Sequence, residues 1–317
     1  MQVQDNQVVG QAQRIISNIR RVVVGKDQVL LWVLAAILAK GHILLEDIPG
    51  VGKTTMALAF SKTLGLDYSR MQFTPDVLPS DVTGYTVLDP KTLESSFRPG
   101  AVLCNLFLAD ELNRATSRTQ SALLEAMEEG QVTVDGISHK VPQPFAVIAT
   151  QNPTGAAGTQ LLPDSQMDRF MVRLSLGYPS PADEIAMIAS RKAGNPLHTM
   201  EPLVSREALM AMQEAVEDTH VNDDIMKYTV ELICATRRHP SISQGASPRA
   251  TLAVIALSKA VARLRGRNYV LPDDVRSVFL RAIPHRLRLS DEAVLQKQTE
   301  EDILENILSA VKSPAVI

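Results

Sequence analysis

Short apolar runs alternate with helix-period patterns over the first half of the chain. Uninterrupted apolar runs are typical of strands that a sheet buries on both faces. The runs that predict strands are 43–46, 106–109, 145–149 and 171–174. Between them, one predicted helix spans about 53–64, and another begins at Ser117 with Gln120 at capping-box spacing. This alternation predicts a parallel sheet covered by helices.

Two segments interrupt the alternation. Residues 84–100 form an extended insertion, and residues 131–141 predict a hairpin. In the hairpin, Asp135 and Gly136 can take the two positive-φ positions of a type I′ turn between alternating residues. Neither segment buries much of itself, so we expect both to project from the domain.

The second half of the chain is helical in pattern, and it follows a proline-rich linker at 177–181. We therefore expect an α/β base domain at 1–178 and a smaller helical lid at 179–317. The expected helix starts are Ser180–Pro181, Ser205, Asp223, Ser247–Pro248, Pro272 and Asp291.

Composition narrows the class of protein. The 317 residues include 32 Lys+Arg and 35 Asp+Glu, a net charge of −3, which gives no general attraction to nucleic acid or anionic lipid. The longest uncharged apolar run, 29–39, is shorter than the ~20 residues of a membrane helix. Cys104 and Cys234 provide neither a disulfide framework nor a zinc site. We expect a cytoplasmic protein that does not insert into membranes.

A glycine-rich turn lies between the first predicted strand and the helix that follows. Backbone N–H groups in such a turn can surround phosphate oxygens, and the helix N-terminus adds partial positive charge. Lys53 can reach the β- and γ-phosphates, and the Thr54 hydroxyl can ligate Mg²⁺. The strict phosphate-loop pattern has glycine where this chain has Asp47. The candidate nucleotide-binding residues are Pro49, Gly50, Val51, Gly52, Lys53, Thr54 and Thr55.

Polar residues follow two further predicted strands. Asp110 can orient a Mg²⁺ shell beside the phosphate loop, and Glu111 can polarise the attacking water. On its own, such an acidic pair is also a favourable start for a helix. Asn152 follows the third strand, where its amide can bond both a γ-phosphate and that water; an isolated Asn–Pro would be a turn. Together these residues predict an ATPase site that binds ATP or ADP with Mg²⁺.

Two arginines are candidates for the same chemistry. Arg169 precedes the fourth strand, and an arginine aimed at a γ-phosphate neutralises charge in the transition state. The alternative is a surface ion pair with Asp168 or another neighbour. Arg249 lies in the first turn of a predicted helix, where its charge opposes the helix dipole and predicts a nearby anion.

These motifs in combination resemble the MoxR family of AAA+ ATPases. The resemblance is carried by 73–85 (FTPDVLPSDVTGY), 108–136, 149–153 (ATQNP), 162–170 (LPDSQMDRF) and 245–250 (GASPRA). It extends from about Gly25 to the C-terminal helices. It implies a three-layer P-loop base domain with an insert in helix 2, a small all-helical lid, and ATP bound between them.

The resemblance also implies roles for individual residues. By similarity, Lys53 and Thr54 belong to Walker A, and Asp110 and Glu111 to Walker B. In the same way Asn152 is sensor 1, Arg249 is sensor 2, and Arg169 is the finger that reaches a neighbouring subunit. The family often replaces the first loop glycine, so Asp47 does not weaken the likeness. Its members form six-membered rings, act with von Willebrand factor A-domain proteins, and remodel or mature protein complexes.

Several alternatives stay open on sequence alone. A nucleic-acid motor related to MCM helicases or a restriction motor is disfavoured by the charge of −3 and the 4% of aromatic residues. A magnesium-chelatase-like motor subunit shares the inserts, and a scaffold that binds ATP without turnover is disfavoured by the intact catalytic set.

Some single residues are also open to two interpretations. Arg114 can face a neighbour's phosphates or have a surface role, and Arg173 competes weakly with Arg169 for the finger position. Arg249 can act within its own subunit or across an interface. On resemblance, Val24–Gly25 can border the adenine, and Trp32 is expected in the core.

Overall fold

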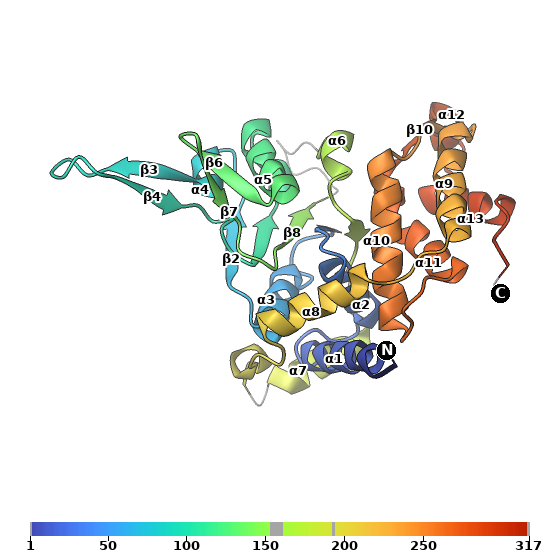
Figure 1. The fold of residues 1–317 in the computed structure, drawn as a ribbon, viewed down its shortest axis with the longest axis horizontal. Helices are drawn as coiled ribbons and strands as arrows, with labels where there is room; N and C mark the ends of the chain where they lie inside the picture. The colour runs from blue at the N-terminus through green and yellow to red at the C-terminus, as the bar shows by residue number, and fades with distance from the viewer. Residues whose placement is uncertain (1, 153–160, 192–193, 316–317) are drawn as a thin grey trace.

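The computed structural model describes residues 2–152, 161–191 and 194–315. The centre of its base domain is a five-stranded parallel sheet (Figure 1). The strand order is β2-β5-β8-β1-β9, and every neighbouring pair is parallel. The strands are β1 Ile43–Glu46, β2 Tyr68–Gln72, β5 Leu106–Asp110, β8 Ala146–Gln151 and β9 Val172–Leu174. Four of them match the predicted runs; β2, at one edge, is additional.

Alternate residues of the strands enter two separate cores, as the period of two in a strand requires. Ile43 and Leu45 pack with the helices on one face, whereas Leu44 packs in the cluster on the other face. The helices that contribute to the first core include α1 Gln2–Arg20, α2 Asp27–Leu38 and α3 Lys53–Thr63. The second core is formed with α4 Pro79–Thr83 and α5 Ser117–Glu129. The base domain thus has the three layers that the fold class implies.

Helix α5 begins at Ser117, as predicted, but its N-terminal cap differs from the expectation. Thr116, not Ser117, is the N-cap: it has extended backbone geometry, and its side chain accepts the N–H of Thr119. Gln120 does not complete a capping box, because its amide donates to the carbonyl of Ala115 (3.1 Å) instead. The predicted cap was therefore wrong by one residue.

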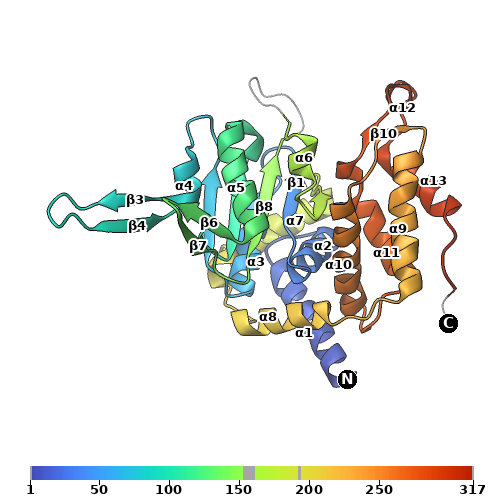
Figure 2. The same ribbon diagram turned by 45° about the horizontal axis from the view of Figure 1, so that its top comes forward.

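Both interrupting segments are antiparallel hairpins. The first pairs β3 Gly84–Leu88 with β4 Ser95–Pro99, and it extends well away from the body of the molecule (Figures 1 and 2). The second pairs β6 Gln131–Val134 with β7 Ile137–Lys140. Its turn has Asp135 and Gly136 at φ 50° and 78°, as predicted. The hairpins touch where the rings of Phe97 and His139 stack, with centroids 3.6 Å apart.

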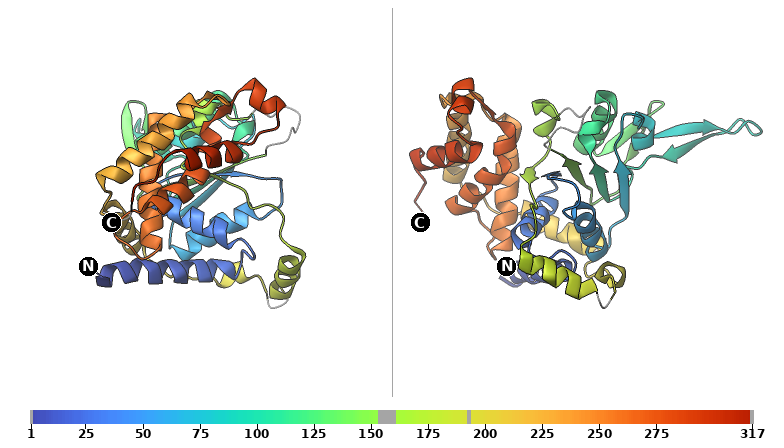
Figure 3. Two further views of the ribbon diagram at one scale, coloured as in Figure 1. Left: turned by 90° about the vertical axis from the view of Figure 1, so that its right-hand side faces the viewer. Right: turned by 180° about the vertical axis from the view of Figure 1, so that it is seen from behind.

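Helices dominate the chain after β9. They are α7 Pro181–Arg191, α8 Arg206–Glu217, α9 Asp223–Arg238, α10 Pro248–Leu264, α11 Pro272–Ala282, α12 Asp291–Leu295 and α13 Glu300–Ala310. The group from α9 to α13 stands beside the sheet, whereas α7 lies near α1 (Figure 3). One detail of the all-helical expectation needs correction: β10 Ile242–Gln244 and β11 Arg288–Leu289 form a short antiparallel pair. Three α-helices, not two, follow α10 in the part of the chain that the structure describes.

The lid shares its hydrophobic core with one face of the sheet. Leu257 of α10 and Phe279 of α11 belong to the same buried cluster as Ile43 of the sheet. Trp32, expected in the core, is only partly buried at the edge of this cluster. The α/β fold class with a helical lid is confirmed. Among the described residues, no helix combines the length and apolarity needed to cross a membrane.

Candidate nucleotide-binding site

The phosphate-loop segment connects β1 to α3 at the carboxyl end of the sheet. Gly50 and Gly52 have φ values of 87° and 99°, in the left-handed region that favours glycine. A Cβ placed on either glycine would have no other atom within 4 Å, so the space beside the loop is open. Lys53 is the first residue of α3, and Thr54 and Thr55 are half-buried in its first turn. The loop therefore has the local geometry that a phosphate cradle needs.

The Lys53 ammonium group lies among acceptors of the site. It donates to the backbone carbonyl of Asp47 (2.8 Å) and to Oδ1 of Asn152 (3.3 Å). Burial lowers the pKa of Lys53, while the negative charges of Asp47, Asp110 and Glu111 act in the opposite direction. A cation held by neutral oxygens in this position can transfer its hydrogen bonds to an anion.

Thr150 joins the two acidic residues to the neighbouring strand. Its hydroxyl donates to Oδ1 of Asp110 (2.7 Å) and accepts the backbone N–H of Glu111 (2.8 Å). The second Asp110 oxygen accepts from Nη2 of Arg70 (2.7 Å). Glu111 has φ 55° and ψ 47°, a left-handed conformation that is strained for a residue with a side chain. The Thr150 bond helps to hold that conformation.

The Glu111 carboxylate is shared by three side chains. Nδ2 of Asn152 donates to Oε1 (3.1 Å), and Nε2 of Gln72 donates to Oε2 (2.9 Å). Arg114 forms an ion pair with the same carboxylate (2.7 Å). In this structure Arg114 therefore pairs within its own chain. Glu111 is held at two oxygens and oriented toward the end of β8.

A continuous chain of hydrogen bonds thus connects Lys53, Asn152 and Glu111, and Thr150 links Glu111 to Asp110. All five side chains lie at the carboxyl ends of parallel strands or just beyond them, where open α/β sheets bind their ligands. Pro153, which completes the Asn–Pro motif, lies outside the described residues.

Asp47 has a structural reason to replace glycine. Its buried carboxylate accepts the hydroxyl of Ser175 (2.7 Å) and the backbone N–H groups of Leu176 (2.6 Å) and Gly177 (2.9 Å). These three bonds connect the start of the phosphate loop to the segment that leads into α7. The position of the loop therefore depends on the chain that leaves the sheet.

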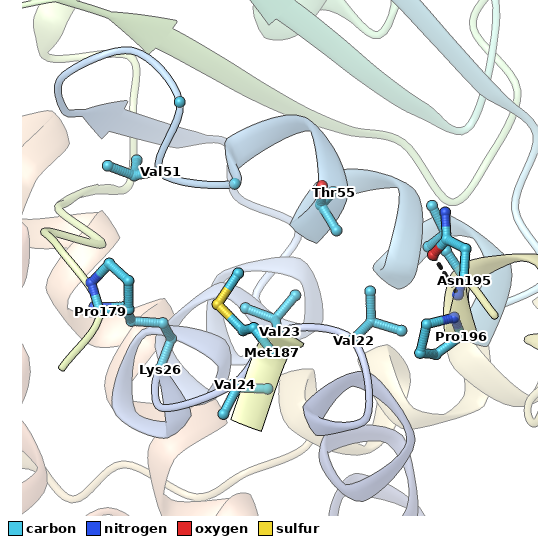
Figure 4. A pocket seen from close by; sticks show the side chains of 13 residues that line it. Val22, Val23, Val24, Lys26, Val51, Thr55, Pro179, Met187, Asn195 and Pro196 are labelled. Atoms are coloured by element: carbon cyan, nitrogen blue, oxygen red, sulfur yellow. Dashed lines mark hydrogen bonds between the residues drawn. The ribbon is translucent and has the colours of Figure 1, made fainter. Parts of the chain in front are cut away.

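A cavity of about 210 Å³ lies beside the loop. Figure 4 shows Val51 and Thr55 on one side of it, opposite Val22–Val24 and Met187 of α7. Its walls are partly apolar, with Asn195 and Pro196 at one end. Size, position and lining suit a nucleoside attached to phosphates on the loop.

Of the two residues expected near adenine, Val24 lines this cavity. Gly25 is needed for packing, because a Cβ built on it would lie 2.3 Å from the carboxyl carbon of Asp183. Asp183 in turn bonds the N-cap Ser180 of α7 (2.7 Å). Gly25 therefore permits the close approach of α7, which forms one wall of the cavity.

The structure does not bring Arg169 and Arg249 to this site. Arg169 donates to the carbonyl of Leu124 (2.9 Å) and pairs with Glu128, and Arg249 pairs with the same Glu128. The predicted anion near Arg249 is thus a carboxylate of α5. Asp168 pairs with Arg286 (2.8 Å), not with Arg169.

These arginines lie near the amino-terminal ends of the parallel strands, at the opposite end of the sheet from the phosphate loop. The N–H of Met171 bonds the carbonyl of His42, the residue before β1, and the His42 ring contacts the carbonyl of Met127. Both contacts are at the amino ends of the strands, whereas the phosphate loop follows their carboxyl ends. Arg173 is separate from both groups and pairs with Glu46 (3.2 Å).

Sequence reasoning missed Thr150, Gln72 and Arg70. Thr150 and its acceptor Asp110 end neighbouring strands, so a correct strand order would have indicated the contact. Gln72 and Arg70 lie on β2, whose mixed polar pattern gives little strand signal because its residues are only partly buried or exposed. The sequence does contain a signal for Glu128, the partner of Arg169 and Arg249. It is an acidic residue in the last turn of α5, where its charge opposes the helix dipole and indicates a nearby cation.

The donor set fits a Mg²⁺–nucleotide. Hydroxyl and carboxylate oxygens of the kind offered by Thr54 and Asp110 are ligands that Mg²⁺ takes, together with phosphate and water. The positive-φ glycines and Lys53 supply donors suited to phosphate. The fold and the motifs of this site together are those of the P-loop AAA+ class, with a lid.

Comparison with known proteins agrees with this class. Residues 42–172 match the ATPase family associated with various cellular activities (AAA), and residues 234–307 match the AAA lid domain. The chain is 37% identical over 313 residues to Chaperone MoxR1 of Mycobacterium tuberculosis, covering 96% of this chain and 82% of that protein. It belongs to the MoxR family of AAA+ ATPases.

Two further relatives cover nearly the whole chain. The uncharacterized protein YeaC of Bacillus subtilis is 46% identical over 301 residues, which are 95% of this chain and 94% of that protein. The crystal structure of a candidate ATPase from Cytophaga hutchinsonii superposes with a TM-score of 0.91 at 34% identity, covering 98% and 97% of the two chains. The likeness therefore includes both the base domain and the lid.

Proposed function

We propose that this protein hydrolyses ATP with Mg²⁺ in a ring of identical subunits and uses the cycle to remodel or mature protein complexes. Six subunits is the ring size that the family resemblance implies. The observation that carries the ATPase proposal is the hydrogen-bond chain from Lys53 through Asn152 to Glu111. It joins a phosphate-binding cation to a candidate general base through one amide.

Each residue has a defined task in this proposal. The loop from Pro49 to Thr55 binds the phosphates, with Lys53 as the charged donor. Thr54 and Asp110 would hold Mg²⁺, which supplies positive charge where the phosphate oxygens become more negative. Glu111 orients and polarises the attacking water, and Asn152 fixes that carboxylate relative to the γ-phosphate.

The positions of Arg169 and Arg249 support a shared site between subunits. The two arginines lie near the amino-terminal ends of the strands, and the phosphate loop lies at the carboxyl ends. Strands of four to six residues rise about 3.3 Å per residue, so the two ends are roughly 15 Å apart. An arginine side chain at the amino-terminal ends of the strands cannot span that distance. We propose that both arginines act on the nucleotide of the neighbouring subunit, so that each active site is completed by two chains.

The projecting hairpins are proposed to contact a protein client. On the first hairpin, Tyr85, Leu88 and Leu93 are 51%, 56% and 73% exposed, and Ile137 of the second is 63% exposed. Large apolar side chains on projecting strands are typical of binding surfaces for other proteins. The stack of Phe97 on His139 would transmit movement between the hairpins, and the second hairpin joins α5 to β8, which ends beside Asn152. A von Willebrand factor A-domain protein is the partner that the family resemblance suggests.

The test of the ATPase proposal is Mg²⁺-dependent phosphate release by the purified chain, compared with Glu111→Gln and Lys53→Ala. We expect Glu111→Gln to bind ATP without turnover and Lys53→Ala to lose binding. Absence of turnover in the unmodified protein, with no change in Glu111→Gln, would overturn the proposal. Light scattering with ATP tests the ring: a particle that stays monomeric under conditions of full turnover contradicts it.

A further inference from the structure

Glu128, in the last turn of α5, receives two arginines from different parts of the chain. Nη1 of Arg169, which precedes β9, pairs with its Oε2, and Nη2 of Arg249, in the first turn of α10, pairs with its Oε1. Because each arginine uses a different oxygen, one carboxylate can hold both guanidinium groups at the same time. The base domain and the lid meet at this carboxylate.

Neither Glu128 nor Arg249 is placed for the stability of its own helix. A negative charge near a helix C-terminus and a positive charge near an N-terminus both oppose the helix dipole. The side chains of Arg169, Arg249 and Glu128 are 29%, 41% and 42% exposed, and ion pairs with such exposure stabilise a fold only weakly. Their arrangement therefore indicates a role other than stability.

The backbones that carry the two arginines are already fastened together. Asp168 accepts the hydroxyl of Ser247 (2.7 Å), the N-cap of α10, and Nε of Arg286 (2.8 Å). Arg286 is nearly buried and also donates to the carbonyl of Phe170 (2.8 Å). With residues 168 and 247 joined in this way, the freedom that remains to the two guanidinium groups is rotation within their long side chains, and Arg169 is also bonded to the carbonyl of Leu124 (2.9 Å). Glu128 restrains that freedom.

The Glu128 carboxylate does not occupy all the N–H donors of Arg169 and Arg249. A guanidinium has five N–H groups, and the Glu128 contacts use Nη1 of Arg169 and Nη2 of Arg249. Nε of Arg169 is buried, and its Nη1 also donates to the carbonyl of Leu124 (2.9 Å), so the donors that Arg169 can offer are those of its exposed end. Because the two side chains stay 29% and 41% exposed, their remaining guanidinium N–H groups could approach a phosphate while both arginines stay paired on Glu128.

We propose that Glu128 is a positioning residue that presents Arg169 and Arg249 as one unit to the nucleotide of the neighbouring subunit. This inference rests on the proposed function, in which both arginines act across the interface. Glu128 touches neither nucleotide nor water in this scheme; it acts through the arginines. Losing it should leave nucleotide binding in place and slow turnover, because misplacing a transition-state group mainly affects the chemical step.

The experiment compares Glu128→Gln, Glu128→Asp and a matched control, Glu129→Gln, in steady-state ATP hydrolysis by the full chain. Glu129 is exposed in the same helical turn, so its substitution removes the same charge. We expect kcat to fall about 10- to 100-fold in Glu128→Gln with KM nearly unchanged, partial recovery in Glu128→Asp, and no effect in Glu129→Gln. In an Arg249→Ala background, adding Glu128→Gln should cost less than it does alone, since the two residues act together.

Different failures can be told apart. If the unmodified chain does not hydrolyse ATP, the proposed function is overturned and this inference with it. If it does, and Glu128→Gln equals Glu129→Gln in kcat, only the positioning role is overturned. A lower unfolding temperature of Glu128→Gln than of Glu129→Gln, with kcat restored at low temperature, would show a structural role and also overturn it.

Discussion

Protonation of the buried His42 should contribute to a loss of stability when the protein is acidified; burial also lowers the pKa of His285, which acts in the same direction. Its Nδ1 accepts the backbone N–H of Val147 (3.0 Å), and its Nε2 lies 3.1 Å from the carbonyl of Met127, so the neutral ring with Nε2 protonated satisfies both contacts. His42 thus connects β8 to the end of α5, close to Glu128. A second proton on Nδ1 would break the bond to Val147 and place a charge in the core.

The magnitude follows from the pKa. Burial lowers the pKa of His42 from 6.5 to about 4. Because the folded value is the lower one, the unfolded chain binds the proton more tightly, and stability is lost as pH falls from 6.5 toward 4. At 1.36 kcal/mol per tenfold change in proton affinity, the loss is about 2 kcal/mol at pH 5 and about 3 kcal/mol below pH 4. Above pH 6.5 the stability does not depend on this group.

The assay is urea unfolding between pH 7.5 and 4.5, followed by the fluorescence of Trp32, the single tryptophan of the chain. His42→Asn keeps an acceptor for Val147 but leaves the Met127 carbonyl unpaired, which costs about 1–3 kcal/mol at neutral pH. The variant should therefore begin less stable and lose less on acidification, so the two curves approach each other. Parallel curves would refute the assignment to His42, because every other titrating group is shared.

Three substitutions test the site itself. Thr150→Val removes the hydroxyl that joins Asp110 to Glu111. It should lower kcat about tenfold, which corresponds to an activation free energy higher by about 1.4 kcal/mol, and leave KM unchanged. An unchanged kcat would contradict the role of Thr150 in positioning Glu111. Asp47→Ala leaves buried donors of the 175–177 segment unpaired and should weaken binding of a fluorescent ATP analogue, whereas wild-type affinity would show that the loop is placed independently. Gly25→Ala should weaken the same binding by displacing α7, while the control Gly10→Ala, with open space around it, should not; equal affinities would argue against the close approach.

The hydrophobic pattern predicted the central strands because they are buried on both faces. The apolar runs at 43–45 and 106–109 are buried and uninterrupted, so they stand out as strands without knowledge of their neighbours. Strand β2 has partly buried and exposed positions at the sheet edge, and its polar residues hide it. The cap of α5 was misplaced because two hydroxyl residues, Thr116 and Ser117, both suit that position, and only the backbone geometry distinguishes them.

The candidate site was predictable as far as its motifs are local. The phosphate loop and the Asp110–Glu111 pair follow strands, and parallel strands bring their carboxyl ends together, so their proximity could be inferred. The partners of Asp47 are about 130 positions away in the chain, and no local pattern indicates them. Arg169 and Arg249 could be recognised as candidates, but their shared carboxylate depends on how the lid packs beside the sheet.

The central claim, that two chains complete each active site, is tested most directly by mixing two inactive variants. Lys53→Ala subunits carry a sound Arg169, and Arg169→Ala subunits carry a sound phosphate loop. We predict that each alone hydrolyses ATP poorly and that mixtures regain turnover, with a maximum at intermediate ratios. Turnover that stays at the level of the separate variants at every ratio, although the subunits assemble together, would contradict the claim.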